Sequence, residues 1–256
     1  MKSREFTSFE LGLVRIMTHL YEKNAVDEKV MDIISMLNID YQTLLMQSRT
    51  LEERINVDSK TNLLKYSDDH LAPILKSASR LVSSTPAKMY DLSFVRFDID
   101  NFSMLNTKYG HNNCDMILVD LAEILTVNSR PTDHIVRYGG EEFDVILPST
   151  NEAGVIKYVD NIYKKIRERM NYNFEGSKVN VTVSAGVCVF SIPVYSLKFY
   201  NNEQIRNEYM KIQKNADHAL YDAKLSGKNQ FRIYSEERDY TAIRKRYLKA
   251  RRLAHA

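Results

Sequence analysis

The amino-acid sequence predicts an α+β fold of the ferredoxin-like or polymerase-palm type, with a central sheet that contains antiparallel strands and a helical region before it. Two observations predict this fold. From about residue 57, segments rich in β-forming residues alternate with helical segments in the order β-α-β-β-α-β-α-β, which is typical of a sheet with helices packed on one side. Before residue 57, apolar residues recur at alternating spacings of three and four, the period of amphipathic helices.

The N-terminal region, residues 1–56, is predicted to form two helices. The first runs from Phe6 to Leu20 and ends at the segment NAVD. The second carries a heptad seam from Val30 to Ile55 with one polar interruption at Ser48, and a 3.5-residue period of this length favours packing against another helix. The partner is either the first helix, in an intramolecular hairpin, or a second chain, in a parallel dimer stalk or a four-helix bundle. We expect a homodimer that this region assembles.

The central region, residues 57–235, holds the predicted sheet. We expect helices over 69–83, 113–128, 151–170 and 212–227, and strands over 92–100, 134–148, 178–190 and 230–234. The segment 134–148 is interrupted by Gly139-Gly140, which predicts a hairpin with its turn at these glycines. The last helix is expected to end at a glycine cap.

Composition and charge limit the function classes. The chain has 256 residues, of which 44% are hydrophobic and 27% charged, as in an ordinary globular protein of one or two domains. No apolar run approaches the roughly 18 residues of a membrane-spanning helix, and MKSREFTSFE lacks the apolar stretch of a secretory signal. We therefore expect a cytoplasmic protein without a transmembrane segment. Cys114 and Cys188, which form no CxxC pair, are expected to be buried reduced thiols.

The C-terminal tail, residues 236–256, is basic. From Arg238 to Ala256 the chain carries seven Lys or Arg and one Asp, whereas the net charge of the whole chain is +3, so the rest carries a net charge of −3. A nucleic-acid-binding domain would show a basic stripe on its folded surface, so we expect no specific nucleic-acid binding. The tail is predicted to be a solvated helix, with binding to RNA or to an anionic membrane as the alternatives.

Acidic residues are predicted to meet at one end of the sheet. The strand that ends in FDID and the strand after the GGEE turn would be antiparallel neighbours, so that Asp98 faces Glu141 and Glu142. Converging carboxylates repel one another unless a cation lies between them, and hard oxygen ligands select Mg²⁺ or Mn²⁺. Such ions hold nucleotide triphosphates, and Gly139 and Gly140 allow the backbone to approach a phosphate closely. The alternative is a type I′ turn with a solvated acidic tip.

Four segments in this order, FDIDNFSMLNTKYGHNNCD, RYGGEEF, VTVSAGV and ADHALYDAKLSGKN, closely resemble the GGDEF family of diguanylate cyclases. The resemblance covers about residues 58–235, and the segment DSKTNLL resembles the family's D-x-L-T-G-L turn, with Asn62 in place of glycine. The resemblance implies a GGDEF fold and the condensation of two GTP molecules into cyclic di-GMP with release of two pyrophosphates, in a homodimer whose subunits each hold one GTP. The alternatives are a weak or inactive domain that serves as a receptor for cyclic di-GMP or GTP, and a cyclase with altered nucleotide choice.

The resemblance also implies roles for single residues. The metal, Mg²⁺ or Mn²⁺, would be bound by Asp98, the backbone carbonyl of Ile99, Glu141 and Glu142, and Glu141 would also be the catalytic base for the attacking 3′-hydroxyl. The substrate-binding residues would be Asn106 and Asp115 at the guanine edge, His111, Gly139 and Gly140 near the phosphates, and Lys224 and Lys228 on the triphosphate. A carboxylate and an amide suit guanine because its N1–H and N2–H₂ groups are donors. Two lysines four residues apart would share one helix face.

Two further features bear on regulation and rate. The segment RPTD, from Arg130 to Asp133, lies where many members of this family carry an R-x-x-D site, which implies feedback inhibition by cyclic di-GMP at Arg130 and Asp133. The sequence departs from the family at Ser103, which replaces a phosphate-contacting lysine, at Thr107, which replaces an aspartate, and at Cys114, which replaces a glycine. Loss of the lysine predicts an affinity or a rate that is about ten- to a hundredfold lower, and activity that is not abolished.

Overall fold

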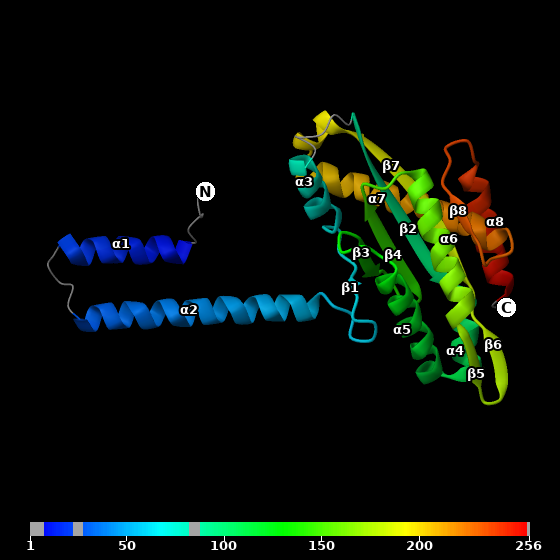
Figure 1. Ribbon diagram of the computed structural model, residues 1–256, viewed down its shortest axis with the longest axis horizontal. Helices are drawn as coiled ribbons and strands as arrows, with labels where there is room; N and C mark the ends of the chain where they lie inside the picture. Colours follow the sequence, from blue (N-terminus) through cyan, green and yellow to red (C-terminus); the bar gives the residue numbers. More distant parts are fainter. Residues whose placement is uncertain (1–7, 23–27, 82–87, 255–256) are drawn as a thin grey trace. The chain divides into compact units, whose positions relative to one another are not determined.

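The computed structural model describes residues 8–22, 28–81 and 88–254 of the chain. The contacts between residues divide the chain into two compact units, Met1–Ile55 and Asn56–Ala256. Figure 1 shows the helices of the first unit and the sheet of the second.

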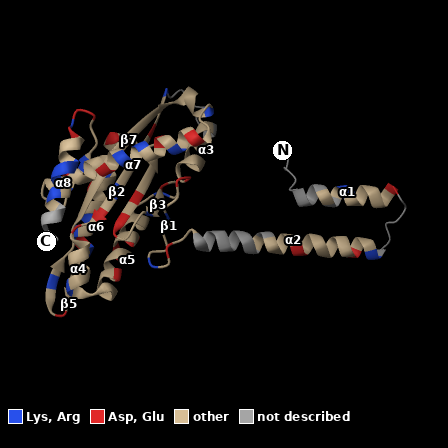
Figure 2. Cartoon of the chain, turned by 180° about the vertical axis from the view of Figure 1, so that it is seen from behind, with Lys and Arg blue, Asp and Glu red and all other residues tan. Residues whose placement is uncertain are grey.

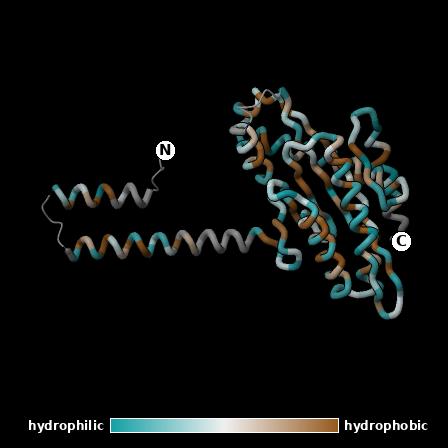
Figure 3. The backbone as a smooth tube through the Cα atoms, viewed as in Figure 1, coloured by the Kyte–Doolittle hydropathy of each residue, from teal (hydrophilic) through white to brown (hydrophobic). Residues whose placement is uncertain are grey.

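The first unit consists of two helices, α1 (Ser8–Glu22) and α2 (Glu28–Ile55), which confirms the prediction of two N-terminal helices; Phe6 lies outside the described residues. Figure 3 shows hydrophobic residues recurring along both helices. Two residues of the heptad seam are exposed, Leu37 by 49% and Leu44 by 63%. No helix within the described ranges is both long enough and apolar enough to span a lipid bilayer.

The second unit is built on a six-stranded mixed sheet with the order β1-β3-β4-β2-β7-β8. The central strand β2 (Met89–Ile99) pairs antiparallel with β4 (Glu142–Pro148) on one side and with β7 (Val183–Pro193) on the other. The remaining strands are β1 (Leu64–Lys65) and β8 (Phe231–Ile233), parallel to their neighbours, and β3 (His134–Arg137), antiparallel to β4. The order β3-β4-β2-β7 confirms the ferredoxin-like arrangement.

Helices cover both faces of this sheet. On one face α5 (His111–Val127) and α6 (Glu152–Arg169) pack on the side of β2 that carries Val95 and Phe97. On the other face α3 (Leu71–Leu81) and α7 (Asn202–Leu225) pack on the side that carries Leu92 and Phe94. Figure 1 and Figure 2, which views the molecule from behind, show α6 and α7 on opposite sides of the strands. The expectation of helices on one side was therefore wrong, because β2 is apolar on both of its faces.

The close approach of α7 to the sheet depends on one glycine. A Cβ atom at Gly186 of β7 would lie 2.0 Å from the backbone oxygen of Ala216 and 2.5 Å from the backbone nitrogen of Leu220. Only glycine fits there, so the side chains of α7 are held directly against β2 and β7.

Two predicted elements differ from the structure by more than a few residues at their ends. The strand expected over 178–190 is split into β6 (Ser177–Asn180), which pairs with β5 (Asn171–Phe174) in a separate hairpin, and β7. Alternating valines run through both strands, so the break is hidden in the pattern. Helix α7 begins ten residues earlier than expected, at a capping box formed by Asn201 and Gln204.

The remaining elements are α4 (Phe102–Tyr109), the 3₁₀ helix η2 (Val194–Lys198) and α8 (Tyr240–Ala254). Helix α8 is formed by the basic tail, and Figure 2 shows Lys and Arg along it. Its first residue, Tyr240, is only 6% exposed. The tail is thus a helix, as predicted, but it is packed against the domain at its start.

Candidate active site

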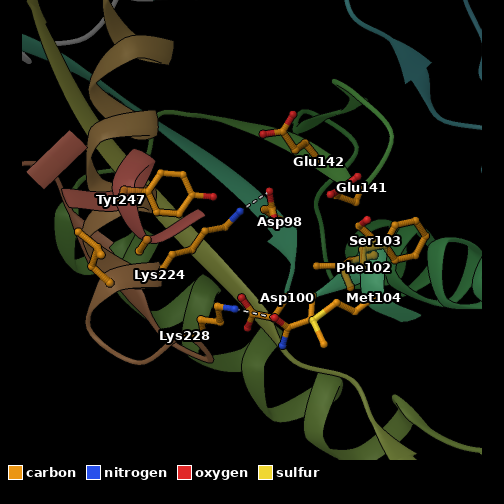
Figure 4. A pocket seen from close by; sticks show the side chains of 14 residues that line it. Asp98, Asp100, Phe102, Ser103, Met104, Glu141, Glu142, Lys224, Lys228 and Tyr247 are labelled. Atoms are coloured by element: carbon orange, nitrogen blue, oxygen red, sulfur yellow. Dashed lines mark hydrogen bonds and ion pairs between the residues drawn. The ribbon is translucent and has the colours of Figure 1, made fainter. Parts of the chain in front are cut away.

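The ends of β2 and β4 bring the predicted acidic residues together. Asp98 is paired in register with Glu142, and the backbone N–H of Ile99 donates to the backbone oxygen of Glu141 at 3.3 Å. Beside them is a cavity of about 460 Å³. Figure 4 shows the side chains that line it. The lining residues are Asp98, Ile99, Asp100, Asn101, Phe102, Ser103, Met104, Glu141, Glu142, Lys224, Leu225, Lys228, Tyr247 and Ala250.

Asp98 and Lys224 form an ion pair inside this cavity. Lys224 Nζ lies 2.6 Å from Asp98 Oδ2, and the two side chains are 13% and 9% exposed (Figure 4). Burial raises the pKa of Asp98 to about 6, against the lowering effect of Lys224 and with smaller raising effects from Glu141 and Asp100. Burial alone would lower the pKa of Lys224, but the charge of Asp98 raises it above its usual value. The cavity therefore holds a charged ammonium beside a carboxyl group that takes up a proton unusually easily.

Glu142 lies partly buried beneath the glycine turn. Burial and the charge of Asp98 both raise the pKa of its carboxyl group. A Cβ atom at Gly139 would lie 3.0 Å from Glu142 Oε2, so a larger residue at position 139 would press on this carboxylate. Glu141, also partly buried, borders the same cavity (Figure 4).

The glycine turn is not of type I′. Neither Gly139 nor Gly140 has a positive φ, although type I′ needs two. The turn is closed instead by Tyr138 N–H, which donates to Glu142 O at 2.9 Å. The guanidinium of Arg137 then donates to the carbonyl oxygens of Gly139 at 3.2 Å and Gly140 at 2.8 Å. These hydrogen bonds fix the backbone that leads into Glu141.

Arg137 also ties the turn to the start of the second unit. Its Nη1 donates to Asp58 Oδ1 at 2.7 Å, and the same oxygen accepts from the backbone N–H and the hydroxyl of Thr61 at 2.9 and 2.8 Å. Burial raises the pKa of Asp58, but the hydrogen bonds from Arg137 and Thr61 outweigh it and lower the pKa to about 2. Sequence reasoning singled out the DSKTNLL turn and missed this link, because nothing in the chain spacing joins residue 58 to residue 137.

A buried ionic network lies next to the acidic strand ends. Arg96, which is 1% exposed, donates to both carboxylate oxygens of Asp144 and to Asp217 Oδ1, each at 2.7 Å. Its guanidinium also stacks 3.6 Å from the ring centre of Tyr138. Arg96 precedes Asp98 by two residues and Asp144 follows Glu142 by two, so the network fixes both strands and the glycine turn.

Lys228 reaches the cavity from the loop after α7. Helix α7 ends at Leu225, and Gly227, Lys228 and Asn229 all have a positive φ, of 112°, 62° and 48°. Lys228 Nζ donates to Asn101 Oδ1 at 2.6 Å (Figure 4). The expectation that Lys224 and Lys228 share one helix face was wrong, because the helix ends between them. Both nevertheless line the same cavity.

Asp100 holds this loop in place. Its carboxylate accepts from Thr182 Oγ1 and Ser184 Oγ, both at 2.7 Å, and from the backbone N–H of Asn229 at 3.0 Å. Both carboxylate oxygens of Asp100 accept hydrogen bonds from the protein, and the residue is only 4% exposed. Asp100 therefore stabilises the structure of the site. The FDID pattern alone did not distinguish its role from that of Asp98.

The N-terminus of α4 forms another wall of the cavity, through Phe102, Ser103 and Met104 (Figure 4). The free backbone N–H groups at a helix N-terminus favour bound anions. Ser103 supplies no positive charge here.

The predicted guanine-binding residues lie on α4 and α5 and do not line the cavity. Both carboxylate oxygens of Asp115 accept from Lys60 Nζ, at 2.6 and 2.7 Å. Asn106 is partly buried and His111 is exposed. Cys114, a residue of α5 and one of the differences from the family pattern, is fully buried in the core. Lys60 was missed from the sequence, where it appears as one charge in a polar turn.

The predicted product-binding pair lies in the loop between α5 and β3. Arg130 is exposed, and its backbone N–H donates to Asp133 Oδ2 at 2.7 Å. Burial raises the pKa of Asp133. Neither residue lines the cavity, and their binding of product stays a prediction.

The donor atoms in the cavity fit a divalent cation. Within the described part of the chain, no three Asp, Glu, His or Cys side chains are gathered closely enough to form a ready metal site. In the structure, the ammonium of Lys224 supplies the positive charge beside Asp98. Carboxylates and a backbone carbonyl are nevertheless the ligands that Mg²⁺ and Mn²⁺ prefer. A cation that binds here would displace Lys224 from Asp98.

Comparison with known proteins supports this interpretation of the fold. Residues 55–230 match the family described as "Diguanylate cyclase, GGDEF domain". The chain is 31% identical over 211 residues to diguanylate cyclase A of Treponema denticola, with 82% of this chain and 50% of that protein covered. It is 27% identical over 143 residues to diguanylate cyclase DosC of Escherichia coli K12, with 56% of this chain and 28% of that protein covered. The chain thus spans half the length, or less, of these relatives.

Solved structures share the fold. The coiled coil and GGDEF domain of DgcB from Caulobacter crescentus, in complex with c-di-GMP, aligns with a TM-score of 0.63 and 20% identity, over 80% of this chain and 100% of that one. The active GGEEF domain of a diguanylate cyclase from Vibrio cholerae aligns with a TM-score of 0.52 and 23% identity, over 67% of this chain and 98% of that one. Together with the match over residues 55–230, these findings show that the chain belongs to the GGDEF-domain family of diguanylate cyclases.

Proposed function

We propose that this protein condenses two GTP molecules into cyclic di-GMP with release of two pyrophosphates. The observation that carries the proposal is that one cavity is lined both by Asp98, Glu141 and Glu142 and by Lys224 and Lys228. Carboxylates suited to a cation on one side and two ammonium groups on the other match the charge of a metal-bound triphosphate.

The residues of the cavity have distinct tasks in this reaction. Asp98, the carbonyl of Ile99, Glu141 and Glu142 hold Mg²⁺ or Mn²⁺, which when bound lowers the pKa of the attacking 3′-hydroxyl and neutralises charge on the phosphate oxygens. Glu141 accepts the proton of that hydroxyl. Lys224 and Lys228 orient the triphosphate, and the N-terminus of α4 supplies backbone N–H donors to it.

The residues on α4 and α5 select guanine over other bases. Asp115 accepts from the N1–H and N2–H₂ groups of guanine, with Asn106 beside it and His111 at the edge of the substrate. Gly139 and Gly140 leave the turn free of side chains where the phosphates approach. GTP has to displace Lys60 from Asp115, which is an exchange of one exposed ion pair and so costs little.

The proposed dimer involves helix α2, and the proposed product inhibition involves the loop between α5 and β3. Each subunit holds one GTP, so the reaction needs two catalytic domains face to face in a homodimer. The exposed Leu37 and Leu44 of the α2 seam suit packing between two chains. The exposed guanidinium of Arg130, with Asp133, is the site at which cyclic di-GMP inhibits the enzyme.

The test of this function is turnover by the full chain. With GTP and Mg²⁺ the protein is expected to form cyclic di-GMP and pyrophosphate. Glu141→Gln is expected to stop turnover without unfolding the protein. The matched control is Glu236→Gln, which alters an exposed glutamate outside the cavity. Arg130→Ala is expected to relieve inhibition by added product. A wild-type protein that binds cyclic di-GMP but never consumes GTP would be a receptor. Activity per chain that stays constant on dilution to monomers would contradict the two-subunit mechanism.

A further inference from the structure

Helix α8 is anchored on α7 by aromatic and ionic contacts. Tyr240 stacks on His218 and on Tyr234, with ring centres 5.2 and 5.0 Å apart, and its hydroxyl accepts from the backbone N–H of Ser235 at 3.1 Å. Just before the helix, Arg238 forms an ion pair with Asp222 of α7. These contacts fix the start of α8 against the catalytic domain.

One face of this anchored helix reaches the cavity. Tyr247 lies two turns after Tyr240 on the same face, and it lines the cavity together with Ala250. The Tyr247 ring stacks on Tyr221 of α7 with ring centres 4.7 Å apart and an interplanar angle of 22°. Two successive anchors, Tyr240 and Tyr247, therefore determine where the phenol hydroxyl points.

That hydroxyl lies next to Lys224. Tyr247 is one of the groups that raise the pKa of Lys224, after Asp98, and Lys224 Nζ lies 5.8 Å from the centre of the Tyr247 ring. Figure 4 shows the ammonium between the carboxylate of Asp98 and the phenol of Tyr247. The family match ends at residue 230, whereas α8 covers Tyr240–Ala254. Tyr247 is thus a cavity residue from outside the matched region.

The two partners of Lys224 respond differently to a bound cation. A cation held by Asp98 would compete with the ammonium for this carboxylate and would weaken the ion pair, which is 2.6 Å long here. Tyr247 is held by its stack on Tyr221, which does not involve Asp98, so its phenol stays beside Lys224. A flexible lysine side chain loses rotamer entropy when it is held in place. Because Tyr247 already restricts Lys224, less conformational entropy is lost when Lys224 binds a phosphate.

We propose that Tyr247 is a positioning residue for Lys224, and that α8 is thereby part of the nucleotide site. The inference rests on the proposed function, since it takes the occupant of the cavity to be the metal-bound triphosphate of GTP. Lys228 has its own anchor in Asn101, so Tyr247 acts on one of the two cavity lysines.

The test compares steady-state kinetics of full-length variants. Tyr247→Phe keeps the ring stack on Tyr221 and removes only the hydroxyl. It is expected to raise the KM for GTP about 10- to 100-fold, the effect of losing one polar contact to a charged group, and to change kcat less than about threefold. The matched control is Tyr234→Phe, which removes a hydroxyl from a ring that packs on α8 away from the cavity. Its kinetics are expected to match wild type.

A double variant shows whether Tyr247 acts through Lys224. In a Lys224→Met background, Tyr247→Phe is expected to change the KM less than about twofold, because the group that it positions is gone. If Lys224→Met lowers turnover below detection, the same four proteins are compared by calorimetric binding of an α,β-methylene analogue of GTP with Mg²⁺.

Each outcome is decisive. Wild-type kinetics in Tyr247→Phe, or an equal loss with and without Lys224, would overturn the positioning role while leaving the cyclase function standing. Wild-type protein that neither turns over GTP nor binds the analogue would overturn the proposed function and this inference with it.

Discussion

Arg96 is expected to be the most costly single charge to remove from the catalytic domain. It is 1% exposed and makes three charge-assisted hydrogen bonds of 2.7 Å, two to Asp144 and one to Asp217. Replacement by methionine keeps most of the volume but leaves the fully buried Asp144 without its counter-ion. Removing one partner of such a pair costs about 3–5 kcal/mol of the free energy of unfolding. For a domain of this size that is a fall in Tm of about 6–20 °C.

The assay is urea unfolding at pH 7, with the slope of the transition checked for constancy. The matched control is Arg206→Met, which breaks an ion pair with Asp69 whose two side chains are 53% and 58% exposed. This variant is expected to unfold at nearly the same urea concentration as wild type, because exposed ion pairs stabilise little.

A double-mutant cycle separates charge pairing from packing. Arg96→Met/Asp144→Leu removes both buried charges, while Asp217, which is 32% exposed, can turn to solvent. The double variant is expected to be less destabilised than the sum of the two single variants by about 1–3 kcal/mol. A cost of Arg96→Met no greater than that of Arg206→Met, or strict additivity in the cycle, would refute the reasoning.

Three further predictions concern the pH dependence that Asp98 and Asp58 cause and the ion pair between Lys60 and Asp115. The pKa of Asp98 is about 6, so protons compete with the metal for this carboxylate below that pH. The Mg²⁺ concentration for half-maximal activity is therefore expected to rise as pH falls from 7.5 to 5. A constant Mg²⁺ concentration would exclude Asp98 as a ligand. The pKa of Asp58 is about 2, below its ordinary value of 3.8, so its stabilising effect is present above about pH 4 and lost as pH falls toward 2. Asp58→Asn should therefore lower the free energy of unfolding by about 1–2 kcal/mol at pH 7, allowing for solvent contact, and by less at pH 3; an equal loss at both pH values would contradict this. Lys60→Leu frees Asp115 from an exposed ion pair and is expected to lower the KM for GTP about 1.4- to 5-fold, whereas an increase would show that Lys60 itself helps to bind the nucleotide.

Local patterns were sufficient where neighbouring residues carry the information. The heptad spacing predicted α2, and the β-forming runs around Gly139-Gly140 predicted the β3–β4 hairpin. Antiparallel pairing of β2 with β4 then placed Asp98 opposite Glu142, as expected from the order of strands. The alternative, a type I′ turn, is excluded because neither glycine has a positive φ, and Arg137 binds the carbonyls of both glycines instead.

The sequence by itself determined the ferredoxin-like order of strands and the identity of the acidic and basic residues of the cavity, because strand period and short motifs are local properties of a chain. Only the tertiary structure decided that Lys224 lies between Asp98 and Tyr247, that Lys60 binds Asp115 and that Asp58 fixes the glycine turn through Arg137. These contacts join residues from 23 to 126 positions apart. Their geometry is set by the packing of α7 and α8 on the domain and by the closure of a turn on a distant strand, and a one-dimensional pattern contains neither.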